Sequence, residues 1–257
     1  MSIKYIDCHT HPLKSYYKDN FHVIEHSRSK NIVAMMVTGC DPKENEEVKK
    51  ICKQFDYTFP VIGIHPNCSS GKKDGEILEN QIDENIKAIG EIGLDFHYPN
   101  TNKKNQIESL IAQINVAKKY NLPVVIHMRD AYAELYEILK NYPDVQFMIH
   151  TYSGNLEWAK KFYELGCYFS FSGVVTYKNA NKTIEVLKWL PIDKILTETD
   201  APYLSPSHKR GELNYSNYVI YTVHYIAGIK QMSVEKFADQ ILKNAKELFK
   251  INVSRKH

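Results

Sequence analysis

Short apolar segments alternate with longer amphipathic segments along the whole chain. Eight apolar segments are rich in Val, Ile, Phe and Tyr and short enough to be buried strands. They cover residues 3–6, 32–37, 59–64, 88–92, 123–126, 145–149, 167–171 and 195–197. The segments between them predict helices at 42–54, 105–120, 131–139, 156–165 and 180–187, with two more after the eighth strand at 217–228 and 234–249.

Strands that alternate with helices predict a parallel sheet, because parallel neighbours need crossover connections. Eight such units in 257 residues match the size of a closed barrel. An open, doubly wound sheet has the same alternation, but residues 7–13 after the first strand contain no glycine and hence no phosphate-binding turn. No linker, low-complexity run or internal repeat interrupts the chain. We therefore expect an α/β protein with a (β/α)8 TIM barrel and one domain over residues 1–257.

Six of the predicted strands carry a histidine or a carboxylate at or near their C-terminal ends. Side chains alternate across a strand, so Asp7, His9 and His11 share one face of the first strand. The other residues of this kind are His65, Glu91, Asp95, His127, His150, Glu198 and Asp200. In a barrel these strand ends form a single rim, and active sites of this architecture lie there.

Each of these residues has an ordinary explanation when it is taken alone. His65 could be a hydrogen-bonded loop residue, Glu91 a buried acid paired with an arginine, and Asp200 a turn residue. Taken together they favour a metal site, because burying many ionisable groups side by side is costly unless cations or mutual pairing offset the cost.

Imidazole nitrogens and carboxylate oxygens suit several divalent ions, and the mixed set does not choose among Mg²⁺, Mn²⁺ and Zn²⁺. Three ligands for each ion would leave positions open for water and substrate. Six ligands with one bridging carboxylate fit two ions about 3.5–4 Å apart, which is a geometry used for phosphoester cleavage. Glu91 is a better bridge than a modified Lys87, because Lys87 lies at the start of the fourth strand, away from the rim.

Composition narrows the function little. Hydrophobic residues make up 43% and charged residues 25%, which is typical of a globular protein with a sizeable core. The net charge of +3 is too small to indicate a nucleic-acid binder by bulk electrostatics, although a local basic patch stays open. The five cysteines are scattered, and the sequence has no apolar leader and no long apolar run. This predicts a cytoplasmic protein without membrane association. No obligatory protein partner is evident.

At the rim motifs the chain resembles the TatD-type metal-dependent deoxyribonucleases, which are amidohydrolase-like barrels. The resemblance runs in order over nearly the whole chain. Its motifs are Asp7-x-His9-x-His11, Gly-Ile-His-Pro at 63–66, Gly-Glu-Ile-Gly-Leu-Asp at 90–95, His-Met-Arg-Asp-Ala at 127–131, His-Thr-Tyr-Ser-Gly at 150–154 and Glu-Thr-Asp-Ala-Pro-Tyr-Leu at 198–204.

This resemblance implies a TIM barrel with two divalent metal ions that hydrolyses DNA phosphodiesters, often from the 3′ end. It implies that one ion is held by His9, His11 and Asp200 and the other by His127 and His150, with Glu91 as the bridge. His65 would lie near the metals and touch the substrate phosphate. Arg129 and Asp95 would stand beside the ligands, and Glu198 and Asp7 would support them, although Arg129 could instead be a structural ion-pair partner.

The mechanism that we expect uses a water molecule activated by the ions. Asp200 is the best candidate for the general base, while His65, Arg129 and the loop with Lys209 and Arg210 could counter the phosphate charge. A solvated loop is an equally good explanation of Lys209 and Arg210.

One segment departs from the family pattern. Where the family usually has Asn-Glu-Pro, this chain has Asn214, Tyr215 and Ser216, so the preceding loop could be positioned differently. A small phosphoester, a lactone or an amide therefore remains an alternative substrate on the same barrel, since fold and ligands are shared across such chemistries. A non-catalytic metal-binding scaffold is the third reading.

Overall fold

The computed structural model describes residues 2–253, and its strands form one sheet in the order β1 to β8. All neighbouring strands are parallel. The strands are β1 (Tyr5–Thr10), β2 (Ile32–Thr38), β3 (Thr58–Ile62), β4 (Ala88–Asp95), β5 (Val124–Arg129), β6 (Phe147–Ile149), β7 (Tyr168–Phe171) and β8 (Ile195–Thr197).

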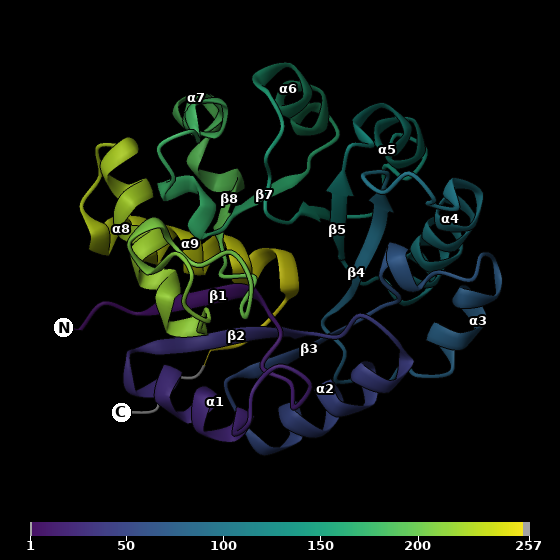
Figure 1. Cartoon of the computed structure of the whole chain (residues 1–257), viewed down its shortest axis with the longest axis horizontal. Coiled ribbons are helices and arrows are strands. Elements are labelled where there is room, and N and C mark those ends of the chain that lie inside the picture. The colour runs from purple at the N-terminus through teal and green to yellow at the C-terminus, as the bar shows by residue number, and fades with distance from the viewer. Residues whose placement is uncertain (1, 254–257) are drawn as a thin grey trace.

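Helices surround this sheet on the outside, as Figure 1 shows. They are α1 (Asn20–Ser29), α2 (Pro42–Gln54), α3 (Lys73–Glu79), α4 (Lys103–Tyr120), α5 (Tyr132–Leu139), α6 (Leu156–Glu164), α7 (Asn181–Trp189), α8 (Val219–Ile229) and α9 (Val234–Phe249). None of the helices in the described part of the chain has the length and apolarity needed to cross a bilayer.

The first and last strands come together at their C-terminal ends and nearly close the sheet. The amide of Asp200 donates to the carbonyl of His9 at 3.0 Å, and the amide of His11 donates to the carbonyl of Ala201 at 2.8 Å. The strands follow chain order with no point at which the order reverses, so the open doubly wound alternative is wrong. The predicted (β/α)8 barrel is confirmed.

The predicted strand bounds were too short at two chemically important places. β1 continues to Thr10 and β4 continues to Asp95, so polar side chains of both motifs lie within the sheet itself. The helices predicted at 42–54 and 234–249 match α2 and α9.

Two helices, α1 and α3, were not among those predicted. α3 contains Gly75, which weakens a helical pattern in the sequence. In the fold Gly75 faces α4, where an added Cβ would lie only 3.0 Å from the Cβ of Ala112. The glycine therefore permits close helix packing that the sequence pattern alone does not indicate.

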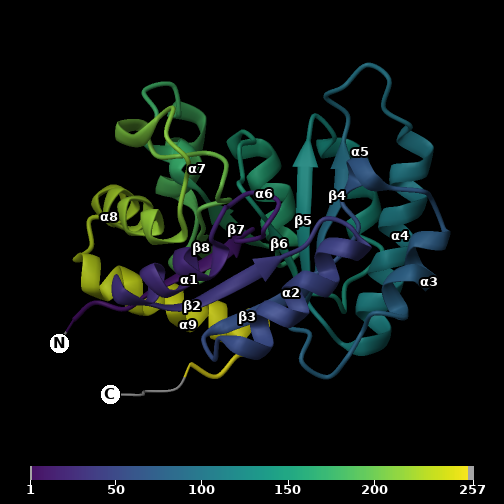
Figure 2. The ribbon, with the colours of Figure 1, turned by 60° about the horizontal axis from the view of Figure 1, so that its bottom comes forward.

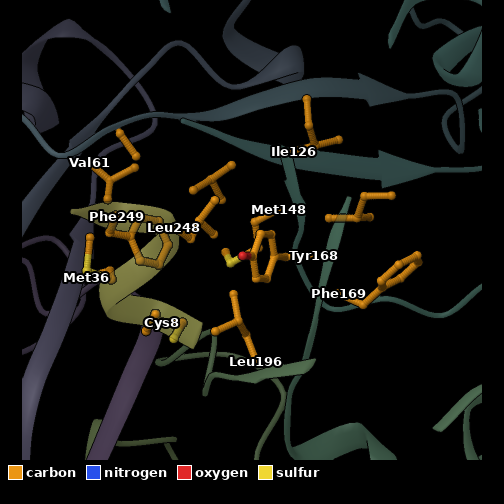
Figure 3. Close-up of a cluster of buried hydrophobic side chains, with 14 of the residues drawn as sticks. Cys8, Met36, Val61, Ile126, Met148, Tyr168, Phe169, Leu196, Leu248 and Phe249 are labelled. Atoms are coloured by element: carbon orange, nitrogen blue, oxygen red, sulfur yellow. The ribbon is translucent and has the colours of Figure 1, made fainter. Parts of the chain in front are cut away.

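Cys8 shows how the faces of β1 divide. It is fully buried and belongs to the apolar cluster of Figure 3, together with Met36, Leu196 and Phe249. Its neighbours Asp7 and His9 take part in polar contacts instead. The alternation inferred from the sequence therefore separates core residues from polar residues along this strand.

Candidate metal centre

The predicted rim residues meet at one cavity of about 660 Å³ over the C-terminal ends of the strands. Five of the six proposed metal ligands line it, and the sixth, His9, is fully buried. The five are His11, Glu91, His127, His150 and Asp200. Figure 2 shows the loop between β4 and α4 extending beyond the strand ends.

One group of donor atoms comes from β1 and from the segment after β8. The Nε2 atoms of His9 and His11 are 3.1 Å apart, and Oδ1 of Asp200 lies 3.5 Å from each of them. Asp200 has a φ of 56°, in the left-handed region that aspartate adopts more readily than most residues. This turn brings its carboxylate next to His9 of β1 and to His11, which directly follows the strand.

The second group comes from β4, β5 and the end of β6. Oε1 of Glu91 lies 2.6 Å from Nδ1 of His127 and 2.7 Å from Nε2 of His150. The two histidine nitrogens are 3.4 Å apart. Gly93 lets β4 and β5 approach here, because an added Cβ would lie 1.9 Å from the carbonyl oxygen of His127.

Glu91 links the two groups through its two different oxygens. While Oε1 faces His127 and His150, Oε2 lies 3.3 Å from Nε2 of His9 and 3.8 Å from Nε2 of His11. Glu91 is buried, so neither oxygen is directed at bulk water. The carboxylate thus stands between two sets of nitrogen donors.

The hydrogen bonds around the histidines fix which ring nitrogens face the cluster. Nδ1 of His11 is 2.8 Å from the carbonyl of Thr38, which can only accept, so Nδ1 carries a proton and Nε2 is the nitrogen that faces the cluster. Nδ1 of His150 likewise faces the carboxylate of Glu198 at 3.3 Å. Burial would lower the pKa of His150, but Glu91 and Glu198 raise it well above its usual value, so its Nε2–H donates to Oε1 of Glu91 at 2.7 Å. A divalent ion would take the place of this proton between the same nitrogen and oxygen. The residues fit divalent metal ions on this ground.

The charges of the cluster favour ionised carboxylates. Burial alone would raise the pKa of Glu91, but His150 and His127 hold it well below its usual range. Burial opposes ionisation of Asp200 in the same way, and its hydrogen bonds from His11 and His9 lower the pKa further than burial raises it. Anionic oxygens are the form that a metal ion requires.

Glu198 and Asp7 are buried acids that hold loops in place. Glu198 accepts hydrogen bonds from the amide of Thr151, at 2.8 Å, and from the hydroxyl of the same residue. Asp7 accepts from the amide of Thr199 at 2.9 Å and from its hydroxyl at 2.6 Å. Burial raises the pKa of Asp7 to about 7, with the bonds from Thr199 acting in the opposite direction. These acids fix the segments that carry His150 and Asp200.

Asp95 is placed beside His127, with its Oδ2 3.4 Å from Nε2 of that ring. Burial would raise the pKa of Asp95, but the neighbouring His127 ring and the hydrogen bond from the amide of His97 lower it to about 2. The backbone amide of Asp95 donates to Oε1 of Gln106 at 2.8 Å, which fixes the position of Asp95. Asp95 therefore orients the His127 ring from the side opposite to Glu91.

His65 lies at the edge of the cluster with a defined tautomer. Its Nδ1 accepts the amide proton of Asn67 at 3.1 Å, so Nε2 carries the ring proton of the neutral imidazole. That Nε2 is 3.7 Å from Oε1 of Glu91. Burial lowers the pKa of His65 to about 4, so the ring is neutral near pH 7. Its N–H is available to donate to a bound oxygen.

The two predicted phosphate-binding cations are placed differently. Arg129 lines the cavity, with its guanidinium carbon 5.6 Å from the ring centroid of Tyr98, and no carboxylate partner for it is found among residues 2–253. Lys209 lies in the short helix η4 (Ser207–Lys209), outside the residues that line the cavity. It pairs with Glu212 at 3.1 Å. The structure brings Arg129 to the site and leaves Lys209 apart from it.

Several cavity residues were not found by the sequence reasoning. Cys40 lines the cavity with its Sγ 4.0 Å from Nδ1 of His11. Ligand atoms of Cys40, His11 and Glu91 lie within 4.8 Å of one another, close enough to hold one metal ion. Tyr16, Tyr98 and Tyr203 line the same cavity. Cys40 follows β2, so its position after a strand was a usable signal, whereas the tyrosines lie in loops and carry no periodic pattern.

The segment that departs from the family pattern is tied firmly to the barrel. Asn214 is buried, and its side-chain amide donates to the carbonyl of Thr199 at 3.0 Å. Its backbone amide donates to the carbonyl of Pro202 at 3.2 Å. The hydroxyl of Ser216 lies 2.8 Å from that of Thr10 on β1. Ser216 therefore contributes a buried hydrogen bond that a proline could not make.

Comparison with known proteins agrees with this geometry. A family described as "TatD related DNase" matches residues 6–250. The chain belongs to this family. An uncharacterized metal-dependent hydrolase of Bacillus subtilis, YabD, is 36% identical to it, covering 96% of this chain and 99% of YabD. YcfH of Escherichia coli, of the same description, is 31% identical, with 97% of each chain covered.

A solved structure extends the comparison to three dimensions. The crystal structure of YJJV, a TatD homologue from Escherichia coli, superposes with a TM-score of 0.90 at 25% identity, covering 96% of this chain and 98% of that one. Membership of the TatD family, expected from the rim motifs, is confirmed. The chain is thus a metal-dependent hydrolase of that family.

Proposed function

We propose that this TatD-family hydrolase cleaves phosphodiester bonds of DNA with two divalent metal ions, Mg²⁺, Mn²⁺ or Zn²⁺, and that residues 1–257 act as one catalytic unit. The observation that carries the proposal is the placement of Glu91, whose two oxygens face two separate sets of histidines. A carboxylate shared in this way is the usual bridge of a two-metal site for phosphoester cleavage.

The proposed ligands divide as the geometry of the donors suggests. His9, His11 and Asp200 would hold one ion, His127 and His150 the other, and Glu91 both. Ions bound there would supply Lewis acidity and lower the pKa of a water molecule.

The remaining steps fall to side chains of the cavity. The Asp200 carboxylate, kept ionised, orients the attacking water and accepts its proton. His65 donates its Nε2–H to a phosphate oxygen, and Arg129 adds positive charge at the cavity wall. Lys209 keeps a weaker part in this proposal, since its ammonium group already has Glu212 as a partner.

The substrate that we propose is a DNA strand end, preferably single-stranded and degraded from 3′ to 5′. The family description supports DNA, and a recessed cavity reaches a flexible strand end more easily than the middle of a stiff duplex. The net charge of +3 argues against a long groove that tracks many phosphates, so affinity should fall only gently with salt.

A small phosphoester is the second candidate, and one observation favours it. The cavity of about 660 Å³ is within the range of pockets that enclose a whole small ligand. Both candidates use the same ligands, so a substrate comparison must separate them.

The test is a time course with manganese or magnesium on an end-labelled linear oligonucleotide and on a closed single-stranded circle, with a small phosphomonoester in parallel. Stepwise shortening of the linear strand from its 3′ end with an intact circle supports the proposal. Equal cutting of the circle would mean endonuclease action. Hydrolysis of the monoester without cleavage of either DNA would replace the proposal with the small-ester function.

A further inference from the structure

Two aromatic walls stand at the cavity on different sides of the proposed metal centre. The first, called here the Tyr203 wall, consists of Tyr16 after β1 and Tyr203 after β8, with ring centroids 5.8 Å apart. The second, called the Tyr98 wall, consists of Tyr98 after β4 and Arg129 at the end of β5. Both walls line the same cavity as the metal-binding residues.

The strand order places the two walls opposite each other. β4 and β5 lie half-way round the barrel from β8 and β1. Each wall is also next to its own group of ligands. The ring of Tyr16 is 6.3 Å from that of His11, and Arg129 pairs in the sheet with Asp95, which contacts His127. The metal centre therefore lies between the walls.

The outer ring of each wall is unusually open. Tyr98 is 53% exposed and Tyr203 is 51% exposed, the two largest values among the exposed large hydrophobic side chains of residues 2–253. Single exposed tyrosines are common, but here one stands at each side of the cavity that the metal-binding residues line. Burial raises the pKa of Tyr203, so its hydroxyl stays protonated and does not repel phosphate.

Planar, neutral rings of this kind stack on nucleobases regardless of sequence. Arg129 over Tyr98 adds a flat cation, which contacts both a base and a phosphate oxygen well. A phosphodiester held at the metal centre has a nucleoside on each side, and each nucleoside would reach one wall.

We propose that the Tyr203 wall and the Tyr98 wall stack the bases on the two sides of the scissile phosphodiester. The smallest good substrate is then a dinucleotide with both bases present. This inference rests on the proposed phosphodiesterase function, and it adds the residues that select a two-sided nucleotide substrate.

The experiment measures kcat/KM of the metal-loaded enzyme on a dinucleotide and on two analogues, each lacking one of its bases. Tyr98→Ala and Tyr203→Ala are compared with the wild type. Tyr225→Ala is the matched control, because Tyr225 is 38% exposed on α8 and is not among the residues lining the cavity. Tyr98→Phe and Tyr203→Phe keep the rings and should retain wild-type behaviour.

The wild type should lose about 10-fold in kcat/KM when either base is removed. Tyr98→Ala should lose about as much kcat/KM on the full dinucleotide. Its kcat/KM should then not change further when one of the two bases is removed, but should still fall when the other is removed. Tyr203→Ala should show the reciprocal pattern, and Tyr225→Ala none.

The stacking proposal would be overturned if each alanine variant still lost kcat/KM on removal of either base, or if both variants had wild-type kinetics. Phosphodiester cleavage would stand in both cases. Failure of the wild type to cleave any dinucleotide, while it still shortens the linear oligonucleotide, would also overturn the stacking proposal alone. Failure on both, with hydrolysis of p-nitrophenyl phosphate retained, would overturn the phosphodiesterase function and the stacking proposal together.

Discussion

The cavity has a floor at the strand ends and an outer rim in the loops beyond them, and the two are built in different ways. The floor residues, such as His9 and Glu91, are buried at strand ends and are held by neighbours inside the barrel. The rim residues, such as Tyr98 and Tyr203, follow the strands in loops and are about half exposed. This difference separates chemistry from selection: the floor fixes the atoms that would bind metal, and the rim meets whatever substrate enters.

The largest effect is expected from the floor. Glu91→Ala should lower kcat by about 10²–10³-fold or more, because it removes the carboxylate shared by both histidine groups. The assay is single-turnover cleavage at saturating manganese, with circular dichroism to show that the barrel is folded. Cys8→Ser is the control, since Cys8 lies between Asp7 and His9 in the same motif but packs in the apolar core. A loss in Cys8→Ser equal to that in Glu91→Ala would remove the distinction between the two faces of β1.

A smaller effect is expected one layer behind the floor. Glu198→Gln should weaken metal binding by about 10–100-fold, because Glu198 holds both the ring of His150 and the amide of Thr151. Titration of the metal-free protein with Mn²⁺ measures this affinity. An unchanged affinity with the same fold would show that His150 needs no support from Glu198.

The smallest effect is expected at the rim. Arg129→Ala should raise KM for DNA by about 10-fold and change kcat less, with similar losses for all sequences, because a phosphate contact carries no base information. Lys209→Ala, its control, should stay within about 2-fold, since Lys209 is paired with Glu212 outside the cavity. Equal losses in both variants would return Lys209 to the substrate-binding residues predicted from the sequence.

The same contrast explains how much the sequence could predict. Strand alternation and position at the end of an apolar segment indicated His9, Glu91, His127 and Asp200, because a parallel barrel brings the C-terminal ends of its strands together. The fold followed from the same pattern, apart from the helices α1 and α3. In α3, Gly75 weakens the helical pattern but permits close packing on α4.

Loop residues carried no such signal. Tyr98 and Tyr203 reach the cavity through turns whose paths depend on tertiary contacts, and Lys209 was judged by charge alone. Ser216 looked like a loss of the family's proline, yet it hydrogen bonds with Thr10 inside the fold. Local charge and composition did not predict these contacts, since they join residues distant in the chain.

The proposed bridge between two ions is tested most directly by metal stoichiometry. Protein purified without chelator and reconstituted with Mn²⁺ or Zn²⁺ would be analysed for bound metal beside Glu91→Ala. Two ions per chain in the wild type, falling to one or fewer in Glu91→Ala, is the expected result. A plateau at one ion in both proteins would contradict the two-metal site.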